Sequence, residues 1–274
     1  MILALSLLGV ASQETVPPAW TRPLEPAPKL LGTFPAEEAT QGVAVDRGSV
    51  FVVDNTRIGR YDRRTKRKIV QNWQERGKGP LIHMNGAIVF GSTLYAAHSN
   101  FPEVPMVSSV ETFDARTLRH TGSHSFGMGE GSLVWMDKQP GDKSGDWFVC
   151  FGHYTGKGGE PGKPNTMTTL VRMDREWRRK GAYSFPPELM ARLDGMTLSG
   201  GVFGPDGLLY ATGHHEPEIY VLRLPKMGSV LELVRIHASP VEGQGIALDR
   251  ATGEFFQLQR KERAIYTFDL FGKR

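Results

Sequence analysis

Apolar and polar positions alternate in short runs along most of the chain, and turns rich in glycine and aspartate separate the runs. An alternation with a period of two is typical of β-strands that bury one face. One order of features recurs: a glycine, an apolar strand, a tight turn, an apolar–aromatic strand, a polar loop and a third strand ending near an aspartate. The copies begin with QGVAVDRGSVFVVDN (41–55), NGAIVFGSTLYAAHSN (85–100), EGSLVWMD with DWFVCFGHY (130–137 and 146–154), SGGVFGPDGLLYATGHH (199–215) and QGIALDRATGEFFQLQR (244–260).

This repeat has the length of a propeller blade. Its opening glycines are Gly42, Gly86, Gly131, Gly201 and Gly245. They follow one another at about 44 residues, which is the period expected of β-propeller blades, and only the third interval is longer because it carries insertions. One blade cannot bury both of its faces without neighbours, so the copies belong to one domain. The sequence therefore predicts an all-β fold, a five-bladed β-propeller.

The two ends of the repeat region predict how the ring closes. A fourth strand follows the third in the first four copies, but the last copy ends without one. An unpaired strand pattern, KLLGTF (29–34), stands at the other end of the sequence. We expect this N-terminal strand to pair with the last blade and to close the ring, leaving no open sheet edge between the first and last blades.

Three regions of different composition follow one another along the chain. Residues 1–12 are an apolar stretch followed by small residues, as in a secretory signal peptide, although no positive charge precedes it. Residues 13–28 form a proline-rich linker, and residues 29–274 form a single β-propeller domain. We expect export to the periplasm or the extracellular space, or a cytoplasmic location if the first segment is not a signal. No apolar run approaches the roughly 20 residues that span a bilayer.

Charge and cysteine content indicate which classes of partner and which covalent links to expect. The net charge is +4, and the basic residues concentrate in segments 57–68 and 175–180 beside turns of the outer strands. Aromatic residues are not interleaved with them as in nucleic-acid sites, so they predict a solvated edge and no nucleic-acid partner. Cys150 is the single cysteine, which rules out an intramolecular disulfide. We expect a monomer whose partner is a small molecule.

The longest loops predict which face of the propeller binds. In this topology, insertions 99–107, 154–167 and 185–199 all lie on one face, and the last contains PPELMARL (186–193), a pattern for a short helix. Long loops on a rigid scaffold commonly carry binding sites. Two sets of polar residues should ring the channel mouth on this face. Before the innermost strands stand Gln41, His83, Asn85, Glu130, Ser199, Glu242 and Gln244; at the ends of the second strands stand Asp54, Asn55, His98, Asn100, His153, Tyr154, His214, His215, Gln259, Arg260 and Lys261.

Histidines and carboxylates in these sets could carry chemistry. His98, His153 and His214 are the candidate proton-transfer residues, because imidazole exchanges protons near neutral pH, and neutral imidazoles could instead hold a divalent metal. Glu130 is a candidate catalytic carboxylate. Candidate substrate-binding residues are Gln41, Asn85, Tyr154, His215, Glu242, Gln244 and Arg260. These side chains could equally be structural, hydrogen-bonding the loops at strand ends.

The blade segments GPDGLLYATGHHEPEIYVLRL and EGQGIALDRATGEFFQ resemble the gluconolactonase, strictosidine-synthase-like and NHL/YVTN group of β-propellers. In its gluconolactonase-like branch, the resemblance implies one divalent metal ion at the top of the channel, held by a glutamate that opens a strand and by asparagine and aspartate residues. Glu130 in MGEGSLVW matches that glutamate, and Asn85 in MNGAIV matches an asparagine ligand. The chain departs from that branch in having five blades instead of six.

Three functions remain open from the sequence. The first is a lactone hydrolase or cycloisomerase acting on an organic acid or lactone, because the resemblance extends to bacterial proteins labelled cycloisomerases. Arg260 or Lys261 would then hold the carboxylate. The second is a non-catalytic propeller that binds a ligand or protein through the same loops. The third is a glycosidase, which would need two or three carboxylates flanking the sugar; Glu130 and Glu242 could supply two and Asp54 a third.

Overall fold

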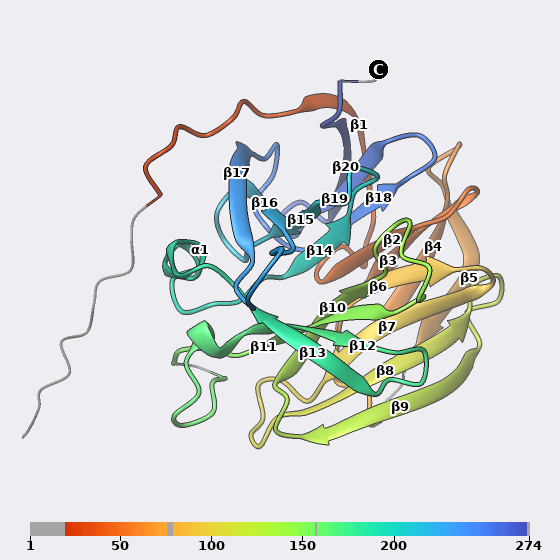
Figure 1. Ribbon diagram of the computed structural model, residues 1–274. Helices are drawn as coiled ribbons and strands as arrows, with labels where there is room; N and C mark the ends of the chain where they lie inside the picture. Colours follow the sequence, from red (N-terminus) through yellow and green to blue (C-terminus); the bar gives the residue numbers. More distant parts are fainter. Residues whose placement is uncertain (1–19, 76–78, 157, 273–274) are drawn as a thin grey trace, which may run out of the picture.

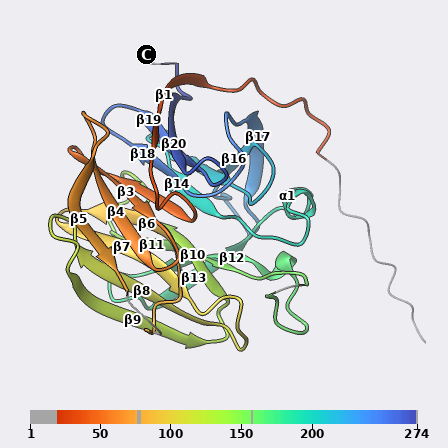
Figure 2. The same ribbon diagram turned by 180° about the vertical axis from the view of Figure 1, so that it is seen from behind.

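A computed structural model describes residues 20–75, 79–156 and 158–272, and its strands form five antiparallel four-stranded sheets (Figures 1 and 2). The expected signal segment, residues 1–12, lies outside the described residues. Blade 1 contains β2 (Gly42–Val45), β3 (Ser49–Val53), β4 (Arg57–Asp62) and β5 (Lys68–Gln74); blade 2 contains β6 (His83–Phe90), β7 (Thr93–Ser99), β8 (Val107–Asp114) and β9 (His120–Met128). Blade 3 contains β10 (Ser132–Asp137), β11 (Trp147–Gly152), β12 (Thr169–Met173) and β13 (Arg179–Ser184); blade 4 contains β14 (Gly200–Phe203), β15 (Leu209–Thr212), β16 (Glu218–Arg223) and β17 (Glu232–Ala238).

Blade 5 is built from both ends of the chain. Its strands are β18 (Ile246–Asp249), β19 (Glu254–Gln259), β20 (Ala264–Asp269) and, as the outermost strand, β1 (Lys29–Pro35). β1 pairs antiparallel with β20, with Phe34 opposite Ile265, and Phe34 is buried between blades 5 and 1. The predicted five-bladed β-propeller and its closure by an N-terminal strand are therefore confirmed.

The segment before β1 also contacts the propeller. Residue Glu25 of the proline-rich stretch exchanges backbone hydrogen bonds with β17, donating to the Ile236 carbonyl at 2.8 Å and accepting from the Ala238 amide at 2.9 Å. Trp20 packs against the core between blades 3 and 4. The described part of the expected linker thus runs along the outer edge of blade 4 (Figure 1).

Little of the described chain is helical, and none of its helices is long and apolar enough to cross a membrane. The predicted short helix is α1 (Pro187–Arg192), which begins at a proline, and a 3-10 turn, η1 (Asn165–Met167), precedes β12. Proline suits the first helical position because it lacks an N–H group that would otherwise have no partner there.

The glycines that open the repeats let the innermost strands meet at the axis. A Cβ atom on Gly42 would lie 2.3 Å from the Asn85 carbonyl oxygen, and one on Gly245 would lie 2.7 Å from that of Gln41. On Gly201 it would lie 2.6 Å from ring carbons of Trp135, whose side chain is buried beside the axis. Real Cβ contacts are not this short, so these positions require glycine.

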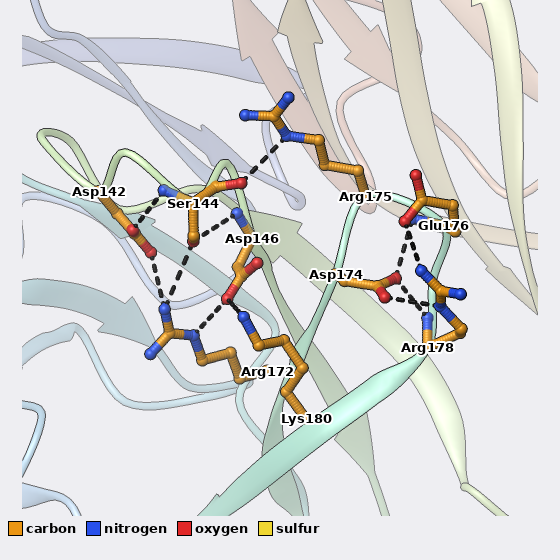
Figure 3. A network of polar contacts seen from close by, with 9 residues as sticks. All are labelled: Asp142, Ser144, Asp146, Arg172, Asp174, Arg175, Glu176, Arg178 and Lys180. Carbon is orange, nitrogen blue, oxygen red and sulfur yellow. Dashed lines mark hydrogen bonds and ion pairs between the residues drawn. The ribbon is translucent and has the colours of Figure 1, made fainter.

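The outer strands of blade 3 are held by ion pairs on the face opposite the long loops. Arg172 of β12 and Lys180 of β13 both contact a carboxylate oxygen of Asp146, each at 2.7 Å (Figure 3). Asp174 closes the turn between these strands by accepting the backbone amides of Glu176 and Arg178 (Figure 3). Asp at such a position caps the amides that the turn leaves free.

We predict that Gly201→Ala destabilises the protein, because the added methyl group would overlap the buried ring of Trp135. Overpacking of this kind costs about 1–3 kcal/mol of unfolding free energy. The matched control is Gly181→Ala in the outer strand β13, where an added Cβ would meet nothing within 4 Å. Urea unfolding of both variants checks this prediction, which would be wrong if both variants were as stable as the parent protein.

Candidate functional site

A cavity of about 640 Å³ opens on the face that carries the three long loops. Such a volume is typical of small-molecule sites. The residues that line it come from all five blades or their connecting loops: Gln41, Asn55, Ile82, His83, Asn85, Phe101, Pro102, Val134, Tyr154, Met196, Thr197, Ser199, His214, Gln244 and Arg260. The structure thus brings together six of the predicted catalytic or substrate-binding residues, namely Gln41, Asn85, Tyr154, His214, Gln244 and Arg260, and three more residues that were predicted to ring the channel mouth, namely Asn55, His83 and Ser199.

Arg260, which follows β19, is the one cationic side chain of the described cavity lining. Its Nε donates to the Thr40 carbonyl at 2.9 Å, Nη2 donates to Gln41 Oε1 at 3.2 Å, and Nη1 donates to His214 Nε2 at 3.4 Å. All three acceptors are neutral. Burial lowers the pKa of Arg260, and the positive charge of Arg263 acts in the same direction.

Asp54, the carboxylate whose charge opposes the lowering of the Arg260 pKa, is already paired elsewhere. Asp54 forms ion pairs with Arg57 at 2.7 Å and with Arg263 at 3.3 Å. No Asp or Glu is among the described residues that line the cavity. Arg260 is therefore a half-buried cation whose charge no carboxylate of the described chain neutralises by direct contact.

Two imidazoles share the cavity with Arg260. Burial lowers the pKa of His83 to about 4, with the charges of His98 and Arg260 adding to the effect. Burial likewise lowers the pKa of His214 to about 4, together with Arg260 and His215. Both rings are therefore neutral at pH 7. His83 makes no side-chain hydrogen bond to the described residues, so its ring nitrogens remain available to a ligand.

His98 lies behind the cavity wall and holds it in place. Its Nε2 accepts the backbone N–H of Ile82 at 3.2 Å, which fixes the other nitrogen as the donor, and Nδ1 contacts Ser109 Oγ at 2.9 Å. Ser109 in turn donates to Glu111 at 2.6 Å, and His120 contacts the same buried carboxylate at 2.7 Å. This chain of hydrogen bonds crosses blade 2, so His98 is satisfied inside the blade and does not line the cavity.

The other predicted residues also lie outside the cavity lining. Glu130 forms an ion pair with Arg179 of β13 at 2.8 Å, and Glu242 forms one with the exposed Lys261 at 2.7 Å. The ring of His153 is buried against Gly131, and burial lowers its pKa. His215 contacts His214 but lines a separate, smaller cavity of about 150 Å³.

These positions bear on the metal that the family resemblance implies. Asn85 lines the cavity, and its buried Oδ1 has no hydrogen-bond partner in the described chain, but Glu130 is engaged by Arg179 on the flank of blade 3. No group of three or more His, Cys, Asp or Glu side chains in the described residues is close enough together to hold a metal. A hard divalent ion prefers carboxylate oxygens, so the residues present do not fit the implied site.

The apolar part of the lining was not predicted. Phe101 and Pro102 come from the first long loop, Met196 comes from the third, and Ile82 precedes β6. The signal that could have identified them is the position of apolar residues inside the long loops, where an exposed loop would carry polar residues. The polar residues could be predicted because the chemistry of their side chains is recognisable without a structure.

The fold is shared with known structures. No protein-family model matches the sequence, and no curated protein matches it. A glutaminyl cyclase from Myxococcus xanthus is 13% identical and superimposes with a TM-score of 0.58, covering 90% of this chain and 97% of its own. The PQQ-bound aldose sugar dehydrogenase from Streptomyces coelicolor is 13% identical, with a TM-score of 0.50, covering 89% of this chain and 81% of its own. Both are β-propellers, and at these identities the similarity shows the fold alone. The resemblance to the gluconolactonase group stays a prediction.

We predict that His83→Gln flattens the pH dependence of stability between pH 6.5 and pH 4. The pKa of His83 falls from the usual 6.5 to about 4 on folding, so in this window the unfolded chain binds the proton and the folded chain does not. The free energy of unfolding must then decrease as the pH falls through the window. His124→Gln, on the exposed face of β9, is the control. Thermal unfolding at several pH values checks this, and equal slopes for His83→Gln and the parent protein would contradict it.

Proposed function

We propose that this protein binds a small organic acid or lactone in the central cavity and acts on it by proton transfer without a metal, as a lactone hydrolase or cycloisomerase. The observation that carries the proposal is Arg260, a cation in a cavity whose other described lining residues are all neutral at pH 7. A desolvated charge is costly unless an opposite charge pairs with it. An anionic ligand would supply that charge.

The hydrogen bonds of Arg260 leave room for such a ligand. A guanidinium has five N–H donors in one plane, and three are used by Thr40, Gln41 and His214. Two donors remain, which is the number that a carboxylate engages in a bidentate pair. A cationic ligand would find no counter-ion among the described lining residues.

His83 is the residue best placed to move the proton. It lines the cavity, it is neutral at pH 7, and its nitrogens are not engaged by described residues. A bound carboxylate would offset the charge of Arg260, one of the three causes that lower the pKa of His83, and would make the imidazole a stronger base. His214 also lines the cavity and is neutral at pH 7, but its Nε2 accepts a hydrogen bond from Arg260.

Hydrolysis of a lactone requires one proton to be moved twice. His83 would take a proton from the attacking water as its oxygen bonds to the lactone carbonyl carbon. The ring C–O bond then breaks, and the imidazolium returns the proton to the leaving oxygen, giving the hydroxy acid. The side-chain amides of Gln41, Asn55 and Gln244 line the same cavity and could donate to the developing negative charge.

A non-catalytic binding propeller is the second candidate. It is favoured by the placement of Glu130 and Glu242, which pair with Arg179 and Lys261, so that no histidine–carboxylate pair converges in the described cavity. The same placement removes support from a glycosidase, which needs two carboxylates beside the sugar.

We predict that Arg260→Gln lowers the affinity or kcat/KM for a carboxylate-bearing lactone or acid by about 10- to 100-fold, because a charge-assisted pair is lost. The matched control is Lys261→Gln, which removes a neighbouring positive charge whose side chain is 74% exposed and paired with Glu242. This control should stay within about twofold of the parent protein. Turnover of candidate substrates is followed by NMR. The candidates are lactones, unsaturated dicarboxylic acids and glutaminyl peptides, the last because one structural neighbour is a glutaminyl cyclase.

The outcomes separate the candidates. The proposal is supported if Arg260→Gln lowers turnover and Lys261→Gln leaves it unchanged. Tight binding of an acid with no turnover would favour the binding propeller. Equal turnover by the parent protein and Arg260→Gln would contradict the role of Arg260, and turnover of glutaminyl peptides alone would replace the substrate class.

A further inference from the structure

The cavity has a polar part and an apolar part, and they come from different segments of the chain. Polar groups come from the strand ends near Arg260, among them Gln41 and His214, which both contact its guanidinium. Apart from Val134 of β10, the apolar side chains come from the long loops and from the segment before β6. Those side chains are Ile82, Phe101, Pro102, Tyr154 and Met196.

Three rings in the lining form a continuous aromatic wall. The centroids of His83 and Phe101 are 5.1 Å apart, and those of Phe101 and Tyr154 are 4.7 Å apart. Phe101 is half-buried between the other two, whereas Tyr154 is almost fully buried. The ring planes of the two pairs are tilted by 42° and 48°, and Phe101 is the least buried of the three rings, so a planar apolar group of a ligand would pack against Phe101.

Contacts between the loops hold the aromatic wall in place. In the first long loop, the Asn100 side chain accepts the Val107 amide at 2.7 Å and donates to the Pro105 carbonyl at 3.0 Å. The Met106 amide of the same loop donates to Glu160 of the second long loop at 3.2 Å. A wall that is ordered before binding costs a ligand less conformational entropy.

The second and third long loops are joined as well. Asn165 is buried in η1, and its side-chain amide donates to the carbonyl of Met196 at 3.0 Å. Its side-chain oxygen accepts the Thr155 hydroxyl at 3.1 Å. All three loops are therefore tied to one another beside the cavity, with Phe101, Tyr154 and Met196 on its surface.

We propose that the natural ligand is an amphipathic acid with a flat apolar body, preferably aromatic, whose ring packs against Phe101 while its carboxylate pairs with Arg260. This inference rests on the proposed function, since it takes the anion at Arg260 as given. A sugar acid of similar size would place hydroxyl groups against Phe101, Ile82 and Met196, which offer them no side-chain hydrogen-bond partner. The aromatic wall thus selects the body of the ligand, and Arg260 selects its charge.

Calorimetric titration with three simple probes tests the proposal. The probes are 3-phenylpropionate, propionate, which lacks the ring, and 3-phenylpropanamide, which lacks the charge. We expect 3-phenylpropionate to bind at least about tenfold more tightly than either of the others, because each loses one of the two contacts. Phe101→Leu should reduce the preference for 3-phenylpropionate over propionate severalfold, and Phe90→Leu, a ring at the far end of β6, should leave it unchanged.

Propionate also reports on the integrity of the variant, because a misfolded Phe101→Leu protein would lose both acids together. Equal binding of the two acids by the parent protein would overturn the aromatic preference while leaving the carboxylate site intact. An unchanged preference in a folded Phe101→Leu variant would overturn the role of the wall. If neither acid binds below about 10 mM, or if the amide binds as well as the acid, the proposed function itself fails.

Discussion

The innermost strands of the five blades approach one another at the propeller axis more closely than side chains would allow. Gly42, Gly86, Gly201 and Gly245 each occupy a place where a Cβ atom would lie within 2.7 Å of a neighbouring backbone or of Trp135. Trp135 occupies the space between Gly86 and Gly201, and its indole ring is buried. The close approach brings the starts of all the inner strands to one small area, so residues far apart in sequence become neighbours at the mouth of the channel.

The site follows from this convergence. Gln41, next to Gly42, and Arg260, which follows β19 of blade 5, meet because the closed ring places blades 5 and 1 side by side. Arg260 is then surrounded by neutral acceptors, while Asp54 is occupied by Arg57 and Arg263. The long loops add the aromatic wall on which Phe101 and Tyr154 meet. A rigid scaffold thus holds one buried charge and one apolar surface in the same cavity, and the two together define the ligand that we propose.

The fold was predictable from the sequence because its determinants are visible as patterns of residue type along the chain. The spacing of the glycines indicates repeated blades, the alternation indicates strands, and the unpaired pattern at 29–34 indicates how the ring closes; the structure confirms this architecture. Half of the candidate site could not be predicted in this way. Glu130 stands beside a strand-opening glycine as the family resemblance requires, yet it pairs with Arg179 on the outer strand of its own blade. That pairing depends on side-chain direction at the rim, which spacing does not determine.

The apolar lining escaped prediction for a similar reason. Asn100, Glu160 and Asn165 tie together the three loops beside Phe101, and these hydrogen bonds join residues up to 54 positions apart. Histidines at strand ends, by contrast, are predicted as site residues from the chemistry of their side chains alone. His98 shows the limit of that approach, since Ile82 and Ser109 satisfy its ring inside blade 2.

A crystal structure of the protein with 3-phenylpropionate bound would test the central claim most directly. The account predicts both carboxylate oxygens within about 3 Å of the terminal nitrogens of Arg260, with the phenyl ring beside Phe101. A ligand ordered elsewhere on the propeller, or Arg260 paired with an Asp or Glu side chain while the acid's carboxylate faces solvent, would contradict it.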